Sequence, residues 1–171
     1  MYQKDKEAAF SELYHQHAKR VYNSIHRIVV HTAEAEDILQ ETFLTVYHDI
    51  EKLNHIIHIE AWIKRIAINK AISHLRKQKI SFTEFSFLDM EAESEYDVNE
   101  NEIFENKVED IRNSIENLPQ GYKTIVNLYL FEQISQEEIA RMLGLSHTTV
   151  RTQYHRAKKK ILLSLKDKVY E

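Results

Sequence analysis

The chain contains no cysteine and very little glycine or proline, with two glycines and one proline in 171 residues. Without cysteine there is no disulfide framework, no thiolate-ligated zinc or iron–sulfur cluster and no thiol nucleophile. Gly121 and Gly144 lie too far apart for a GxGxxG or GxxxxGK[ST] phosphate loop. No apolar run approaches the roughly 18 residues of a membrane span, and MYQKDKEAAF lacks the apolar segment of a secretory signal. We therefore expect a soluble cytoplasmic protein without direct membrane insertion.

Ten histidines raise the question of a metal site. The closest spacings pair His15 with His17 and His55 with His58, but neither pair has a third ligand in a recognisable pattern. No Ser/His/Asp order and no arrangement of paired carboxylates indicates catalysis. The sequence predicts no metal, no cofactor and no enzymatic activity.

The formal net charge of −4 conceals three segments of different sign. Residues 1–79 carry 12 basic and 10 acidic side chains, whereas residues 80–117 carry 2 basic and 12 acidic ones. Residues 118–171 carry 9 basic and 5 acidic side chains. Because two balanced or basic ends flank the acidic segment, the mild overall acidity does not argue against a nucleic acid partner.

Low glycine and proline content, with abundant Glu, Lys, Ile, Leu and Ala, predicts an all-α fold of two small helical domains. The predicted organisation is a domain at 1–79, an acidic flexible linker at 80–104 and a second domain at 105–171. The linker is interpreted either as a solvated tether or as an acidic strand that lies in a basic channel normally used by nucleic acid. The helices are expected at about residues 5–30, 33–50, 60–77, 105–117, 119–132, 135–143 and 146–165.

The segment ISQEEIARMLGLSHTTVRTQYHRAKKKI predicts a helix-turn-helix. Ser135 and Glu138 form the pattern of a capping box, and Ser146 can cap the second helix. Gly144 stands where a tight turn between the helices requires positive φ. In the second helix Val150, Tyr154, Ala157 and Ile161 recur with helical period as the inward stripe. Ahead of the motif, Pro119 suits the first turn of a supporting helix.

The opposite side of the second helix carries hydrogen-bonding and basic side chains, namely Thr148, Arg151, Thr152, His155 and Lys159. Arginine bonds guanine in bidentate fashion, threonine contacts the thymine methyl, and the run RAKKK at 156–160 adds charge for phosphates. This pattern is typical of a helix that enters the major groove. The alternative is an ordinary helical hairpin with a solvated basic face.

Two helices of the first half carry further polar faces. In residues 33–50, Asp37, Gln40, Glu41 and Leu44 share a face opposite the apolar positions Ile38, Leu39, Thr42, Val46 and Ile50. In residues 60–77, Arg65, Asn69, Ile72 and Arg76 line up, flanked by Trp62, Lys64, Lys70 and Lys77. A mixture of cations, an amide and an aromatic suits backbone tracking and base stacking. The alternative for the first face is plain solvated surface, and for the second it is a bundle helix with a cationic outer edge.

Taken in order, AEDILQETF, AWIKRIAINKAISHLRK and ISQEEIARMLGLSHTTVRTQYHRAKKKIL resemble a bacterial extracytoplasmic-function (ECF) sigma factor of the sigma-70 superfamily. The resemblance covers roughly residues 8–77 and 115–165. It implies a sigma2-like bundle of three or four helices and a sigma4-like helix-turn-helix domain. It further implies binding to core RNA polymerase, through the beta-prime clamp and the beta subunit, and to promoter DNA. Many such proteins are held inactive by an anti-sigma factor, which is a probable further partner.

The resemblance assigns roles to each face. Asp37, Gln40 and Glu41 match the family pattern AEDxxQE of the clamp-docking helix, and Leu44 lies on the same face. The implied minus-ten residues are Trp62, Arg65, Asn69, Lys70, Arg76 and Lys77. Asn69 and the loop Leu53–Glu60 are candidates for holding a flipped base. The implied minus-thirty-five residues are Thr148, Arg151, Thr152, His155, Arg156 and Lys159, with Arg156 nearer the edge of the face and suited to phosphate.

Two departures limit what carries over. The loop LNHIIHIEAW lacks the Gly, Arg or Phe common in the family, and His155 replaces a side chain of another type. The promoter sequence is therefore not implied. Two other functions stay open on the residues alone: a stand-alone helix-turn-helix transcriptional regulator, and a helical interaction protein without a role on DNA. A stand-alone regulator has no need of the faces at residues 33–77, and the basic helix face disfavours a role without DNA.

Overall fold

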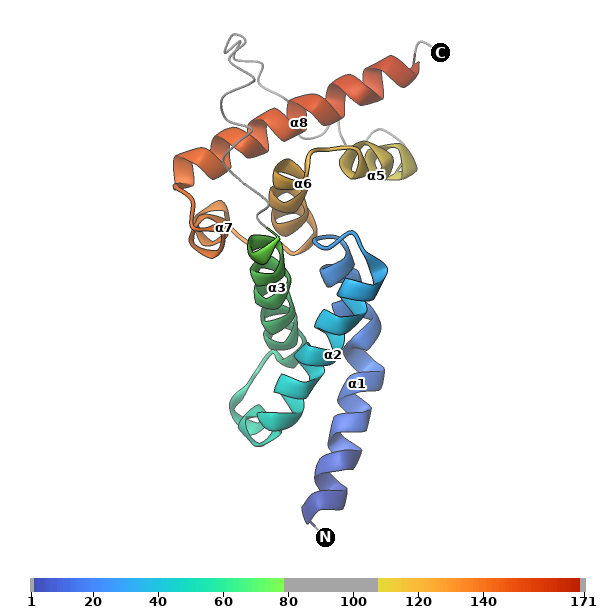
Figure 1. Ribbon diagram of the computed structural model, residues 1–171, viewed down its shortest axis with the longest axis vertical. Helices are drawn as coiled ribbons and strands as arrows, with labels where there is room; N and C mark the ends of the chain where they lie inside the picture. Colours follow the sequence, from blue (N-terminus) through green and yellow to red (C-terminus); the bar gives the residue numbers. More distant parts are fainter. Residues whose placement is uncertain (1, 79–107, 170–171) are drawn as a thin grey trace. The chain divides into compact units, whose positions relative to one another are not determined.

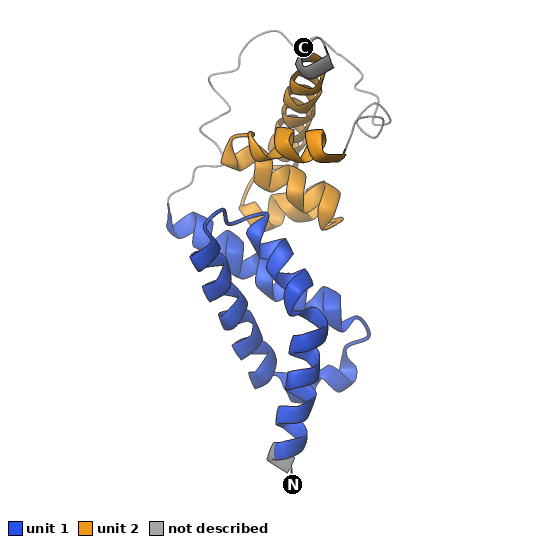
Figure 2. Cartoon of the chain, turned by 90° about the vertical axis from the view of Figure 1, so that its right-hand side faces the viewer, with its two compact units in different colours: residues 1–79 blue, residues 80–171 orange. Residues whose placement is uncertain are grey.

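The computed structural model describes residues 2–78 and 108–169, and every element in these two ranges is helical. The predicted acidic linker at 80–104 lies outside the described residues. The chain divides into two compact units, Met1–Lys79 and Ile80–Glu171, which Figure 2 colours separately. Each unit has its own core and is described by itself. The structure and the similar folds reported below confirm the prediction of an all-α protein.

The first unit is a bundle of three long helices, α1 (Tyr2–His26), α2 (Thr32–His48) and α3 (Ile59–Lys77), with a short 3₁₀ helix η1 (Ile50–His55). Figure 1 shows the three long helices side by side, and each packs against the other two. Burial of one large apolar side chain in the core stabilises the folded state by about 1.5–3 kcal/mol. The buried side chains include Val21, Ile25, Ile38, Phe43, Val46, Ile63, Ile68 and Leu75.

Helix boundaries in this unit differ from the sequence prediction in two places. The first helix ends at His26 rather than near residue 30, because Ile28 and Val29 close a turn onto the Ile25 carbonyl. The second helix ends at His48, so Ile50 is buried from η1 and not from α2. The 3₁₀ helix itself was not predicted, since six residues give too little period to distinguish it from a loop.

The second unit contains α5 (Val108–Glu116), α6 (Gln120–Val126), a π-helical segment η3 (Asn127–Phe131), α7 (Gln136–Leu143) and α8 (His147–Val169). Helix α8 packs against α5, α6 and α7. The prediction of one helix at 119–132 was wrong in detail: Pro119 is the N-cap residue of α6, and the helix widens after Val126. The Glu132 N–H donates to the Asn127 carbonyl, five residues back, at 3.2 Å.

The turn between α7 and α8 follows the predicted chemistry. Ser135 Oγ accepts from the Glu138 N–H at 3.3 Å, and Ser146 Oγ accepts from the Thr149 N–H at 3.0 Å. Gly144 has φ 68° and ψ 34°, the left-handed conformation that costs a residue with a Cβ free energy. The Leu145 N–H donates to the Ala140 carbonyl at 2.9 Å, which closes the end of α7. These bonds fix the entry of α8 against α7.

Candidate nucleic-acid interface and docking face

The outward face of α8 is the first candidate surface. The inward stripe is as predicted, since Val150, Tyr154, Ala157 and Ile161 are at most 7% exposed. Ser135 caps the beginning of α7 and Ser146 caps the beginning of α8, from which the first exposed turns of α8 project. The predicted reading residues lie together on the exposed side, with Arg156 half-buried at its edge; they are Thr148, Arg151, Thr152, His155, Arg156 and Lys159.

One lysine of the basic run 156–160 does not belong to this face. Lys158 is 7% exposed, and its Nζ lies 5.6 Å from the centroid of the Tyr154 ring. The Tyr154 ring in turn contacts Tyr129, with 4.6 Å between the centroids. The expectation that the whole run offers charge to phosphates was therefore wrong for Lys158. Lys159 and Lys160 remain exposed.

The second candidate surface is the outer side of α3. Arg65, Asn69, Arg76 and Lys77 are exposed, and Trp62 and Lys70 are half-buried beside them. All six lie within about two-fifths of the helix circumference at 100° per residue. The alignment of Ile72 with this stripe was wrong, since Ile72 is 2% exposed and belongs to the core. Ser73, which the sequence analysis did not single out, is exposed on this side instead.

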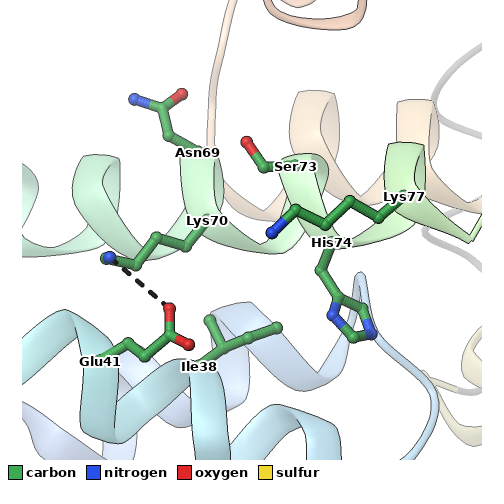
Figure 3. A pocket seen from close by; sticks show the side chains of 7 residues that line it. All are labelled: Ile38, Glu41, Asn69, Lys70, Ser73, His74 and Lys77. Atoms are coloured by element: carbon green, nitrogen blue, oxygen red, sulfur yellow. Dashed lines mark ion pairs between the residues drawn. The ribbon is translucent and has the colours of Figure 1, made fainter.

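A pocket of about 340 Å³ opens where α3 crosses α2 (Figure 3). Its wall from α2 is Ile38 and Glu41, and its wall from α3 is polar, with Asn69, Lys70, Ser73, His74 and Lys77. Lys70 Nζ lies 3.7 Å from Glu41 Oε2 across it. The lining therefore combines the ammonium groups of Lys70 and Lys77 with the Glu41 carboxylate, while the Asn69 and Ser73 side chains point away from α2 in Figure 3.

His74 at the rim of this pocket connects the two helices. Its Nε2 lies 3.1 Å from Glu34 Oε2, and Gln78 Nε2 donates to Glu34 Oε1 at 2.9 Å. Glu34 lies in the first turn of α2, and His74 and Gln78 lie in and just after the last turn of α3. This contact fixes the register of the two helices beside the pocket.

All four residues of the predicted docking face on α2 are exposed. Asp37, Gln40, Glu41 and Leu44 are spaced i, i+3, i+4 and i+7, which places them on one side of the helix. The opposite positions, among them Ile38 and Val46, are buried. Leu44 is 68% exposed, and an apolar side chain within a polar face is a common feature of binding surfaces. Glu41 also lines the pocket, so the docking face and the α3 surface meet at this residue.

The segment Leu53–Glu60 is more structured than a loop. Leu53 to His55 belong to η1, and Ile59 and Glu60 belong to α3, which leaves only Ile56, Ile57 and His58 between helices. Ile57 is 90% exposed. The prediction treated the segment as one loop, because its length and composition gave no sign of helix on either side.

Glu60 takes part in contacts that the sequence did not indicate. Its Oε2 accepts from Arg20 Nη1 at 2.7 Å, and its Oε1 lies 3.3 Å from Lys64 Nζ. His17 Nδ1 lies 3.7 Å from Oε2. The hydrogen bond from Arg20 lowers the pKa of the Glu60 carboxyl below its ordinary value of 4.5; burial opposes this shift, and the hydrogen bond from Lys64 adds to the lowering. The only sequence signal was an acidic residue in a first helical turn.

Within residues 2–78 and 108–169, no three histidine or acidic side chains are grouped to hold a metal ion. Among the helices of these ranges, none is long and apolar enough to cross a membrane.

The comparisons with known proteins follow this division of the chain. Residues 13–80 match the family Sigma-70 region 2, and residues 109–161 match Sigma-70, region 4. The chain is 30% identical over 153 residues to the RNA polymerase sigma factor SigV of Bacillus subtilis, covering 87% of this chain and 86% of that protein. It is 30% identical over 169 residues to the ECF RNA polymerase sigma-E factor of Haemophilus influenzae, covering 93% of this chain and 88% of that protein. The chain belongs to the ECF sigma factors of the sigma-70 family.

Other similarities agree with this assignment. The ECF RNA polymerase sigma factor SigE of Mycolicibacterium smegmatis is 29% identical over 155 residues, which are 90% of this chain but 60% of that protein. Two solved structures share the fold. The sigma factor RpoE, crystallised with the anti-sigma factor NepR from Bartonella quintana, gives a TM-score of 0.55 at 17% identity, covering 92% of this chain and 97% of that one. CnrH, in complex with the cytosolic domain of CnrY, gives a TM-score of 0.52 at 20% identity, covering 94% of this chain and 90% of that one.

Proposed function

We propose that this chain binds core RNA polymerase and directs it to promoters, where it recognises and helps to melt the DNA that starts transcription. The observation that carries the proposal is the presence of three polar surfaces of different chemistry on two separate units. The first unit bears the α2 docking face and the cationic α3 surface, and the second bears the helix-turn-helix face. Family membership supports the same function.

The docking face has the composition of a protein-binding surface. Asp37 and Glu41 offer carboxylates to a basic partner, Gln40 offers an amide, and Leu44 offers exposed apolar area at the end of the patch. In a protein interface, such an apolar group becomes desolvated inside a polar rim. We assign this face to the beta-prime clamp, and we expect the second unit to contact the beta subunit.

The α3 surface is suited to a single strand. Arg65, Arg76 and Lys77 supply charge along the helix, while Asn69 and the half-buried Trp62 supply an amide and a ring for bases. Lys70, held beside Glu41, faces the pocket in Figure 3. We propose that this surface binds the minus-ten strand after it separates, because extruded bases need both stacking and hydrogen-bonding partners.

The α8 face is suited to duplex DNA. Arg151, Thr152 and His155 project from the first turns of the helix, where a helix-turn-helix reads base edges in the major groove. Lys159, together with the half-buried Arg156, is placed for phosphates further along. We propose that this face reads the minus-thirty-five element and that the protein acts by binding alone, without catalysis of its own.

The proposal extends to domains, location and regulation. We assign sigma2-like function to residues 1–79, a linker to 80–104 and sigma4-like function to 105–171. The activity takes place in the cytoplasm with the polymerase. Because RpoE is a sigma factor crystallised with an anti-sigma factor, we propose an anti-sigma factor as a further partner of this chain.

The test is reconstitution. The purified chain is mixed with core polymerase, the mixture is resolved by gel filtration, and the complex is used for run-off transcription on genomic fragments with mapping of start sites. Co-elution with core and starts that require the chain are expected. Binding of the chain alone to duplex promoter DNA, together with no association with core, would overturn the proposal in favour of a stand-alone helix-turn-helix regulator.

A further inference from the structure

The second half of α1 belongs to a long stretch of sequence without acidic residues. Residues 13–33 contain no Asp or Glu, and only two stretches of the chain that lack them are longer, at 61–83 and 139–166. Those two contain the α3 surface and the α8 face, for which DNA is the proposed partner. A surface that binds phosphates excludes carboxylates, because charges of the same sign repel each other. The stretch at 13–33 shares this property and has no partner assigned to it.

The cationic residues of this stretch do not all serve the same purpose. Arg20 donates to the Glu60 carboxylate at 2.7 Å, and His17, with its side chain 15% exposed, lies 3.7 Å from the same carboxylate. These two side chains therefore link α1 to α3. Lys19 is exposed, and no residue of the described ranges forms an ion pair with it. Its charge is left for a partner outside this unit.

Lys19 lies on the outward side of α1, away from the buried residues Val21 and Ile25. Four exposed polar residues of this side fall within about a quarter of the helix circumference at 100° per residue and extend over roughly 16 Å of its length. We call them the α1 stripe; they are His15, Lys19, Asn23 and His26. At its edge the half-buried Tyr22 packs against His26, with 5.6 Å between the ring centroids.

The chemistry of the α1 stripe suits phosphate better than a protein surface. Lysine, histidine and asparagine side chains all donate hydrogen bonds, which phosphate oxygens accept. The stripe contains no exposed apolar residue, whereas the docking face on α2 contains Leu44, which is 68% exposed. A protein interface buries an apolar core inside its polar rim, and the stripe has nothing to form such a core. The backbone of a nucleic acid needs only charge and donors.

The α1 stripe does not continue the α3 surface. Helices α1, α2 and α3 each pack against the other two, so the outward sides of α1 and α3 point in different directions (Figure 1). We propose that the α1 stripe is a second nucleic-acid backbone site of the first unit, which binds phosphates of promoter DNA apart from the strand held on α3. This inference rests on the proposed function. Because its contacts go to phosphates, they strengthen binding without selecting a sequence.

The test measures how salt changes the affinity of the reconstituted holoenzyme for DNA. Binding is followed on two promoters that differ in their minus-ten and minus-thirty-five sequences, with Lys19→Ala and Asn23→Lys. The matched controls are Lys4→Ala and Ala8→Lys, which make the same changes of net charge at exposed positions of α1 outside the acid-free stretch. Association of each variant with core polymerase is measured separately, in the absence of DNA.

Lys19→Ala is expected to make the slope of log affinity against log salt shallower by about 0.9 on both promoters. The advantage of the wild type over this variant should then fall about 3.5-fold between about 50 and 200 mM salt. Asn23→Lys is expected to steepen the slope by about 0.9 and to tighten binding at low salt, a gain that misfolding cannot produce. Both control variants should keep the slope of the wild type, because their positions face no phosphate.

Unchanged slopes for Lys19→Ala and Asn23→Lys, or equal changes in the two controls, would overturn the inference. A loss confined to one promoter would also contradict it, since a phosphate contact is independent of sequence. If Lys19→Ala weakens association with core polymerase and leaves the salt slope unchanged, the α1 stripe is a protein surface and the inference is wrong. Failure of the wild-type chain to form a holoenzyme would refute the proposed function itself, before any variant is compared.

Discussion

The ammonium group of Lys158 lies over the ring of Tyr154, 5.6 Å from its centroid, on the inward side of α8. The next residue, Lys159, points to solvent on the same helix. Two adjacent lysines of the run 158–160 therefore have the same charge but different environments, one buried and one exposed. The Lys158 ammonium is shielded from water by the aromatic ring, and its alkyl chain is buried. The Lys159 ammonium is in solvent, where it can bind a phosphate.

This difference predicts opposite outcomes for two adjacent alanine variants. Lys158→Ala should lower the free energy of unfolding by about 1 kcal/mol, through lost cation–π and packing contacts. Lys159→Ala should leave stability unchanged and weaken holoenzyme binding to all promoter sequences alike, with a salt slope shallower by about 0.9. Circular dichroism melting and binding over a salt series measure the two effects. A loss of stability for Lys159→Ala would contradict the assignment.

Arg151 gives a prediction about sequence preference. If its guanidinium reads a base from the exposed face of α8, Arg151→Ala should reduce discrimination between the preferred and substituted minus-thirty-five sequences by about 1–3 kcal/mol. Competition binding of holoenzyme to the two promoters measures this difference. Lys166→Ala, an exposed basic residue later on the same helix, is the control. Equal weakening on both promoters would make Arg151 a phosphate contact.

Much of the second unit could be predicted because its signals are local. Ser135, Gly144 and Ser146 each specify a helix end through their own chemistry, and the apolar period of α8 gives its buried side. Lys158 could not be predicted, because a lysine at the border of the apolar stripe can turn either way. The π-helical segment after Val126 could not be predicted either, because nothing in the residues 127–131 distinguishes it from a continued α-helix.

In the first unit, too, features set by neighbouring residues could be predicted, whereas contacts between distant residues could not. The exposed positions of α2 followed from helical period, but Ile72 of α3 was misplaced because it lies at the edge of the buried side. The bond from Arg20 to Glu60 joins residues forty positions apart, which no local pattern predicts. The pocket between α2 and α3 likewise depends on how two helices cross.

The docking face predicts a clear response to a charge placed at its one apolar residue, Leu44. Leu44→Asp should weaken association with core polymerase by about 2 kcal/mol, because an apolar hot spot is replaced by a carboxylate. Val30→Asp is the matched control, since Val30 is exposed at 53% in the connection between α1 and α2. Fluorescence anisotropy of the labelled chain with core gives both dissociation constants. Similar weakening by both variants would point to a general effect of charge.

Two left-handed residues in the second unit predict changes of opposite sign. Gly144→Ala should destabilise by about 1 kcal/mol, because the residue at φ 68° gains a Cβ. Gln133, with φ 54°, already bears that strain, so Gln133→Gly should stabilise by up to about 1 kcal/mol. Circular dichroism melting measures the shifts, and the fluorescence transition of Trp62 in the first unit should not move. Destabilisation by Gln133→Gly would show that the backbone is unstrained there.

Glu60 predicts a dependence of stability on pH. Its pKa in the folded chain is lowered, chiefly by the hydrogen bond from Arg20, so the ionised carboxylate favours the folded state. Its contribution is fully present above the unfolded value of 4.5 and is lost as the pH falls through the lower folded value. At pH 7, Glu60→Gln should reduce the free energy of unfolding by about 0.5–1 kcal/mol, allowing for solvent screening of a partly exposed pair.

The difference between wild type and Glu60→Gln should shrink as the pH is lowered below 4.5, because the protonated glutamic acid and glutamine are then both neutral. The difference in free energy of unfolding is measured by urea unfolding followed by the fluorescence of Trp62. Trp62 is the only tryptophan of the chain and lies two residues beyond Glu60. Glu7→Gln, an exposed carboxylate of α1, is the control and should show no such convergence. A difference that stays constant from pH 7 to well below 4.5 would mean that side-chain shape, and not the charge of Glu60, holds α3 to α1.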